Sequence, residues 1–270
     1  MDDCAHSASD LRATMTLTFL GTGTSTGVPQ PLCDCQVCRS ADMRDNRMRT
    51  SALLRCRGKN ILLDCGPDFR TQILRAGNPH LDALIITHTH YDHLGGIDDL
   101  RPYCPGHPDG FPIYCRADVA ADIRARMPYC FGDHPYPGAP RFDIHVIDTE
   151  PFFIDDIEIT PLPVMHKPDF PITGFRVGPL SYVTDCKIMP RHTIELIRGS
   201  HTFVINALRH TAHPSHLNLQ EALDVISEVR PSRALLTHIS HSLGRHADIA
   251  PTLPEGVMLA YDSLTLDIDI

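Results

Sequence analysis

The 270-residue sequence lacks the features that would place it in a membrane or on a nucleic acid. No stretch approaches the roughly 18 consecutive apolar residues that a membrane-spanning helix needs. The acidic N-terminus, Met1-Asp2-Asp3-Cys4, has no apolar core of the kind that export signals carry, so we expect a cytoplasmic protein. The net charge is −9 with histidine neutral, and the basic residues form no run. This charge pattern argues against a broad surface for the phosphate backbone of a nucleic acid.

Internal repeats and low-complexity segments are also absent from the sequence. A chain of this length can bury a large core, so we expect a single domain at 15–270 that follows a loose tail at 1–14. Ten cysteines would suit a disulfide scaffold in a small secreted protein. In a chain this large, and with no export signal, metal binding or burial explains them better.

Short apolar runs alternate with stretches of helical spacing along the chain. Strands are expected near 16–20, 51–55, 60–64, 82–87, 112–115, 142–147, 157–164, 172–177, 180–185, 201–207 and 233–241, with a closing hairpin at about 257–269. Helices are expected near 68–76, 117–127, 190–198 and 217–229. A segment rich in proline and glycine, 128–141, is expected to form a loop at the rim or lid of a site. This alternation predicts an α/β (α+β) chain without defining how its layers stack.

The most informative motif is the hexapeptide 88–93, His-Thr-His-Tyr-Asp-His, which follows the apolar run 84–87 and precedes the glycine pair 95–96. Four metal-competent side chains in six residues would compete for hydrogen-bond donors and repel one another if they were buried without a ligand. A divalent cation resolves that conflict, because neutral imidazole nitrogens and carboxylate oxygens are good ligands for zinc, manganese or iron. The motif therefore predicts a metal site at the end of a strand.

A second cluster consists of three cysteines, Cys33, Cys35 and Cys38. Three thiols within six residues favour a closed structural zinc site that takes its fourth ligand from elsewhere in the chain. The alternative is a loop of reduced thiols. His210, His213 and His216 also recur at every third residue, but Pro214 breaks any common helical face, so we expect no third metal site there.

The hexapeptide, with the Leu-Gly-Gly that follows it, resembles the signature of the metallo-β-lactamase superfamily, His-x-His-x-Asp-His after a buried strand. The opening segment 16–23 and the segment 61–66 resemble the first two elements of the same pattern, and the resemblance extends to Ile268. It implies an αββα sandwich, in which two β-sheets pack face to face with helices outside. It also implies that Asp64 supports the metal site rather than binding metal.

The resemblance further implies seven metal ligands, carried over by position. His88, His90 and His166 would hold one metal, Asp92, His93 and His238 would hold the other, and Asp185 would touch both. The alternative role for Asp92 is to orient a neighbouring histidine. Two such cations bind a water between them and lower its pKa, which gives a hydroxide nucleophile at neutral pH. The expected reaction is therefore a hydrolysis, with Asp92 among the catalytic residues.

The cysteine loop, together with His-Ile-Ser-His at 238–241, is similar to the phosphodiesterase family of the bacterial carbon–phosphorus lyase pathway. That similarity implies that His241 completes the zinc site of Cys33, Cys35 and Cys38. The phosphodiesterase family also has a histidine at the position of His216. We interpret His216 as a general acid or a contact to the substrate phosphate. The alternative for His216 is a simple capping or surface residue. Proteins of pyrroloquinoline quinone biosynthesis share much of this pattern, so the cysteine loop does not define the substrate.

The sequence thus predicts a dinuclear metal-dependent hydrolase of small phosphodiesters, cyclic ones included, with two divalent ions (zinc, manganese or iron) and one structural zinc. A 3′-processing ribonuclease would need an RNA-clamping arm and a basic surface, and neither is visible. A thioester or lactam hydrolase and a non-catalytic binding protein of a cofactor pathway are further alternatives. The oxygen-reducing diiron members of the superfamily carry a glutamate where this chain has His90, and they add a flavin domain for which this chain has no room. We therefore reject a redox function. A homodimer is a family expectation.

Overall fold

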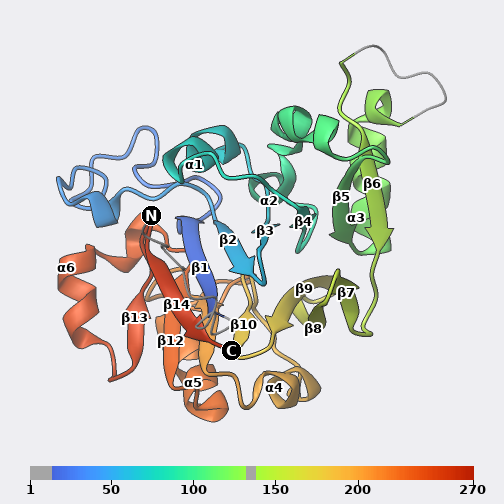
Figure 1. The fold of residues 1–270 in the computed structure, drawn as a ribbon. Coiled ribbons are helices and arrows are strands. Elements are labelled where there is room, and N and C mark those ends of the chain that lie inside the picture. The colour runs from blue at the N-terminus through green and yellow to red at the C-terminus, as the bar shows by residue number, and fades with distance from the viewer. Residues whose placement is uncertain (1–13, 132–137) are drawn as a thin grey trace, which may run out of the picture.

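The computed structural model describes residues 14–131 and 138–270, which form two seven-stranded mixed sheets (Figure 1). The first sheet has the order β14-β1-β2-β3-β4-β5-β6 and the second has the order β13-β12-β11-β10-β9-β8-β7. The strands of the first sheet are β1 (Thr14–Gly21), β2 (Ser51–Cys56), β3 (Lys59–Leu63), β4 (Ala83–Ile85), β5 (Phe111–Cys115), β6 (Phe142–Val146) and β14 (Thr265–Asp269). Those of the second are β7 (Phe152–Ile154), β8 (Ile157–Lys167), β9 (Phe170–Val177), β10 (Leu180–Tyr182), β11 (Thr202–Asn206), β12 (Arg233–Thr237) and β13 (Val257–Leu259).

Helices cover the outer faces of both sheets, with α1 and α2 above and α4 and α5 below in the view of Figure 1. The α-helices are α1 (Phe69–Arg75), α2 (Tyr91–Leu94), α3 (Ala117–Arg126), α4 (Arg191–Ile197), α5 (Leu219–Val229) and α6 (His246–Ile249). Short 3₁₀ helices are η1 (Met43–Asp45), η2 (Ile97–Gly106), η3 (Pro128–Cys130), η4 (His241–Leu243) and η5 (Ala250–Thr252). None of the helices in these described segments is long and apolar enough to cross a membrane.

Three clusters of buried apolar side chains hold the layers together. The central cluster lies between the sheets, where Leu54 of β2 and Phe175 of β9 are both almost fully buried. Leu53 points to the other side of β2, into a cluster with the helices that cover the first sheet. A third cluster joins the second sheet to α4 and α5. Because the strands are apolar on both faces, each sheet needs a helical layer outside. The αββα sandwich that the motifs imply is confirmed.

The closing hairpin expected at 257–269 is wrong. β13 pairs in parallel with β12 in the second sheet, whereas β14 pairs antiparallel with β1 in the first. The segment between them crosses from one sheet to the other, since Ala260 N donates to Leu236 O and Ser263 N donates to Phe19 O. Two short apolar runs with a turn between them have the same pattern whether or not they pair with each other.

Two further expectations fall partly outside the described residues. The tail at 1–14 lies outside them except for Thr14, which is the first residue of β1. Residues 132–137 of the loop at 128–141 also lie outside, and η3 forms its beginning.

A buried polar network fastens the start of the chain to the crossing segment. The Asp262 carboxylate accepts hydrogen bonds from Thr22 N at 2.9 Å, Thr22 Oγ1 at 2.8 Å and Met48 N at 2.7 Å. The Arg47 guanidinium, which is only 3% exposed, donates to Thr22 Oγ1 at 2.8 Å and to Ala260 O at 2.6 Å. Burial raises the pKa of Asp262 to about 6 and lowers the pKa of Arg47 to about 10.

We expect Asp262→Ala to destabilise the fold by roughly 2–4 kcal/mol, because it removes three hydrogen bonds and the carboxylate that most favours the buried charge of Arg47. For a chain of this size that loss corresponds to a melting temperature lower by roughly 5–10 °C, measurable by calorimetry. Asp267→Ala is the matched control, since that side chain is exposed on β14. Equal melting temperatures for the two variants would contradict the proposed importance of the network.

Candidate metal centre

Most of the predicted site residues follow the ends of strands, and His166 lies within the last residues of β8. Asp64 comes directly after β3, and the hexapeptide 88–93 follows β4. In the second sheet, Asp185 follows β10 and His238 comes directly after β12. The carboxyl ends of parallel strands are the usual place for a binding site in α/β folds. Asp64, Asp185 and His238 have φ angles of 61°, 57° and 54°, a left-handed conformation that is uncommon for non-glycine residues.

Two glycines allow the metal-motif loop to pack closely against the loop after β3. Cys65 N donates to His93 O at 2.7 Å, and Gly96 N donates to Cys65 O at 2.9 Å. A Cβ atom on Gly66 would lie 2.0 Å from Asp92 O, and one on Gly96 would lie 2.0 Å from Gly66 O. Only glycine fits at such an approach, so the backbone holds the motif in place before any ligand binds.

Hydrogen bonds orient the histidines of the motif. The Asp64 carboxylate accepts from Thr87 N at 2.8 Å and from His93 Nδ1 at 2.7 Å. Because Asp64 holds Nδ1 of His93, Nε2 faces the centre of the site, 3.3 Å from Asp92 Oδ2 and 3.3 Å from Asp185 Oδ1. Nδ1 of His88 lies 2.9 Å from Thr87 Oγ1, and Nδ1 of His166 donates to the Asp185 carbonyl at 2.7 Å. Asp64 thus has the supporting position that the resemblance implies.

The remaining polar atoms converge on Asp185. Potential ligand atoms lie within 4.8 Å of one another in three groups: Asp92, His93, Asp185 and His238; His88, His90 and Asp185; and His166, Asp185 and His216. Asp185 belongs to all three groups. The structure therefore brings all seven predicted ligands together, with one difference from the predicted division. His166 falls into a group with Asp185 and His216, rather than with His88 and His90.

Several of these atoms are buried and have no hydrogen-bond partner, namely His88 Nε2, Asp92 Oδ2, His93 Nε2 and His216 Nδ1. Burial alone would raise the pKa of Asp185, but His238 and His93 beside it hold that pKa well below its usual value. Burial also lowers the pKa of His88 and of His238. The Asp185 carboxylate, surrounded by buried imidazoles with unpartnered nitrogen atoms, is a donor set that fits divalent cations.

His216 lies in the same cluster and does not cap α5. Asn218 is the N-cap of that helix, and its side chain accepts a hydrogen bond from Glu221 N. The buried ring of His216 lies 4.7 Å from the ring of His166 and 4.9 Å from that of His238. Burial lowers the pKa of His216 to about 3, so this ring is neutral at physiological pH.

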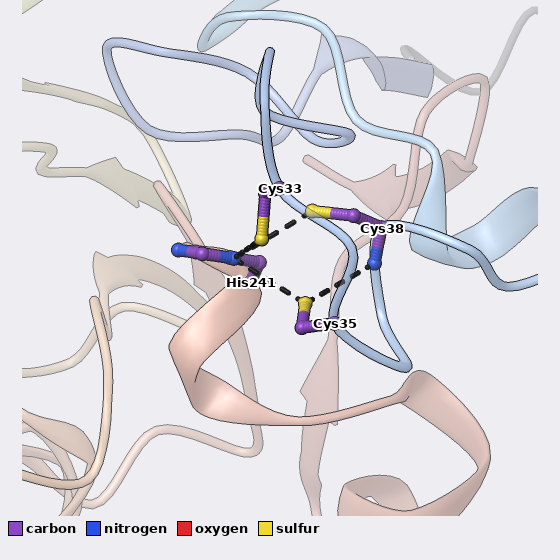
Figure 2. A group of neighbouring side chains, drawn as sticks. All are labelled: Cys33, Cys35, Cys38 and His241. Carbon is purple, nitrogen blue, oxygen red and sulfur yellow. Dashed lines mark hydrogen bonds between the residues drawn. The ribbon is translucent and has the colours of Figure 1, made fainter.

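The three cysteines of the second cluster surround one imidazole nitrogen (Figure 2). Nδ1 of His241 lies 3.1 Å from the Sγ atom of Cys33, 3.4 Å from that of Cys35 and 3.6 Å from that of Cys38. The backbone N–H of Cys38 lowers the pKa of the Cys35 thiol to about 6, and the thiolate is the form that binds metal. All nine described cysteines are free thiols, these three included. Three sulfurs and one nitrogen form the donor set of a structural zinc site.

Sequence reasoning missed two threonines that contact His238. Thr50 Oγ1 lies 3.1 Å from His238 Nδ1, and Thr24 Oγ1 lies 3.2 Å from His238 Nε2. Thr24 directly follows the Gly21-Thr22-Gly23 segment, whose Gly23 forms a bridge with Ile239. In the sequence, only the neighbouring glycine segment suggested that Thr24 lies near the site, and nothing suggested it for Thr50.

Comparison with known proteins shows which family this chain belongs to. Residues 59–239 match the family described as "Beta-lactamase superfamily domain". A protein of Porphyromonas gingivalis named "Octanoyltransferase" is 41% identical over 254 residues, which are 93% of this chain and 51% of that protein. A "Ribonuclease Z" of Acaryochloris marina is 29% identical over 168 residues, which are 60% of this chain and 47% of that protein. The chain thus spans about half the length of these curated relatives.

Solved structures agree with that match. A crystal structure described as "a New Diphosphatase from the PhnP Family" matches with a TM-score of 0.88 and 36% identity, over 94% of this chain and 97% of that one. Zn²⁺-bound PqqB from Methylobacterium extorquens matches with a TM-score of 0.77 over 94% of this chain and 100% of that one. Its identity of 18% supports the fold alone. The chain therefore belongs to the β-lactamase superfamily and has the metallo-β-lactamase fold that the motif at 88–93 predicts.

Proposed function

We propose that this chain is a metal-dependent hydrolase of small phosphodiesters, cyclic ones included. The observation that carries the proposal is the position of Asp185, an ionised carboxylate shared by three groups of potential metal ligands. When two divalent cations are bound, they supply Lewis acidity and an activated water for attack on phosphorus. Zinc, manganese and iron all suit this mixture of imidazole and carboxylate ligands.

We assign the ligands by their positions in the family pattern, and the ring of His166 also lies 5.6 Å from that of His88 and 4.8 Å from that of His90. His88, His90 and His166 would hold one cation, Asp92, His93 and His238 would hold the other, and Asp185 would contact both. Asp64 keeps His93 in the tautomer that binds metal through Nε2, since it accepts the Nδ1 proton. We assign His216 as a contact to the substrate phosphate or a general acid, because its buried ring lies beside those of His166 and His238.

We likewise assign Cys33, Cys35, Cys38 and His241 to one structural zinc. The ligand His241 is three residues from the proposed catalytic ligand His238. Zinc at this position would stabilise the segment that carries both histidines, because it would connect η4 to the N-terminal cysteine loop.

The similarity to a diphosphatase at 36% identity favours a second candidate, hydrolysis of a diphosphate linkage at the same site. Both reactions involve attack on phosphorus, so the same ligands serve both. The similarity to a protein named octanoyltransferase favours an acyl alternative, hydrolysis of an octanoyl thioester. Ribonuclease Z relatives favour RNA processing, but the net charge of −9 is unfavourable for binding a polyanion.

A substrate panel separates these candidates. Purified protein with added Mn²⁺ or Zn²⁺ would be assayed on bis(p-nitrophenyl) phosphate, a cyclic ribose phosphodiester, a dinucleoside diphosphate, an octanoyl thioester and a precursor tRNA. We expect turnover of the phosphodiesters, and turnover of the diphosphate would favour the second candidate. Turnover of the thioester or the precursor tRNA alone would contradict the proposal, as would a metal-loaded sample inert toward every substrate.

We expect Asp185→Ala to lower kcat by about three orders of magnitude or more, because it removes a carboxylate shared by both cations, and metal–substrate electrostatics supply several kcal/mol. Elemental analysis should show less bound metal in the same variant. Asp143→Ala, which removes a half-exposed carboxylate on β6, is the control. Full activity or full metal content in Asp185→Ala would show that the assignment is wrong.

We expect Cys35→Ser to lose about one zinc ion per chain and to lower the melting temperature, while kcat on bis(p-nitrophenyl) phosphate changes much less. Cys104→Ser, which replaces a half-buried thiol outside the cysteine cluster, is the matched control. If Cys35→Ser kept its full zinc count and melting point, the cluster would not be a zinc site.

We expect His216→Ala to keep its metal content and to lose about 100-fold in kcat, since it removes one positioned contact to the reacting group. Wild-type kinetics in this variant would remove His216 from the mechanism. Loss of metal together with activity would instead make His216 a ligand, in line with its place beside His166 and Asp185.

A further inference from the structure

The loop between β11 and α5 contains a histidine that the proposed mechanism leaves unused. His213 lies three residues before His216, and the two rings are 5.1 Å apart. The ring of His216 in turn contacts the rings of His166 and His238. His213 is half-exposed, whereas His216 is buried. His213 is therefore the outermost imidazole in a row that leads from the metal centre toward solvent.

His213 is not a candidate metal ligand. Each group of potential ligand atoms in the described part of the chain consists of other residues, and none includes His213. The row of rings nevertheless places it beside the site, and its local hydrogen bonds show which of its nitrogens is available.

Hydrogen bonds from Ser215 determine the tautomer of His213. The backbone N–H of Ser215 lies 3.2 Å from Nδ1 of His213, and the Ser215 hydroxyl lies 3.2 Å from the same atom. A backbone N–H can only donate, so Nδ1 must be the acceptor. The ring is then neutral and carries its one proton on Nε2. In the described residues Nε2 of His213 has no hydrogen-bond partner.

We propose that His213 positions the substrate by donating a hydrogen bond from Nε2 to a non-bridging oxygen of the bound phosphoryl group. This inference rests on the proposed function of the metal centre. A tetrahedral phosphoryl group has oxygens that face away from the metal ligands, and an N–H on the solvent side can reach one of them. Because Ser215 holds the ring in one tautomer, the donor is oriented before the substrate binds. His213 donates a hydrogen bond without transferring its proton.

The test compares three substitutions of His213 in the metal-loaded protein. We expect His213→Ala to lower kcat/KM on bis(p-nitrophenyl) phosphate by about 10- to 100-fold, the range for a hydrogen bond to a charged group. His213→Gln should stay within about threefold of the wild type, because its longer carboxamide can place an N–H near the position of Nε2. His213→Asn is too short to do so and should resemble the alanine variant. The pH profile should keep its shape in all three.

His210→Ala is the control, since His210 is an exposed residue of the same loop. Its kinetics should match the wild type. If His213→Ala behaves like His210→Ala, the proposal is wrong. If the glutamine and alanine variants are equally impaired, His213 has only a structural role and the proposal is again overturned. Elemental analysis and melting temperature should be unchanged in every variant that supports it.

A binding measurement separates this inference from the proposed function. Calorimetric titration of the Mn²⁺-loaded protein with inorganic phosphate requires no turnover. We expect the Kd to rise about 10-fold or more in His213→Ala and to recover in His213→Gln. If the wild type hydrolyses no phosphodiester but shows this pattern, the proposed reaction fails and the role of His213 stands. If phosphodiesters are hydrolysed and phosphate binds the alanine variant as tightly as the wild type, only the role of His213 fails.

Discussion

The site depends on one electrostatic arrangement, the ionised carboxylate of Asp185 among imidazoles from both sheets. A buried carboxylate is costly unless its charge is compensated, and here the neighbouring groups are His93 from the first sheet and His238 from the second. His93 is itself oriented by Asp64, and Asp64 is held by Thr87. The loops that end at Asp185 from both sheets therefore each help to position a ligand atom.

Residues with a left-handed backbone conformation follow three of the strands, and they explain how short loops can direct the side chains into the metal centre. Asp64, Asp185 and His238 all leave their strands in a conformation that costs free energy for a non-glycine residue. The surrounding hydrogen bonds compensate for this cost, and the side chains are then held in position before a cation binds.

The hexapeptide at 88–93 could be identified from the residues themselves, because four potential ligands lie within six positions. His166, Asp185 and His238 were placed only by the resemblance to the family, because nothing in their local sequence marks them as ligands. Other features depend on pairing at long range, which a single sequence does not encode. The runs at 257–259 and 265–269 look like a hairpin, yet they belong to different sheets. Thr50 contacts His238 only because β2 begins beside the last ligand loop. The place of His216 beside His166 and Asp185 likewise depends on side-chain distances.

The pairing of β14 with β1 has a consequence for biosynthesis. β1 leaves the ribosome long before its outer neighbour in the first sheet, which spans residues 265–269. Until those residues emerge, one edge of β1 is an unpaired strand that can associate with other nascent chains. The crossing segment at 260–264 must also arrive before Asp262 can bond to Thr22. Folding of the first sheet should therefore be completed only after β14 has been translated. Until then, we expect the new chain to be a substrate for chaperones.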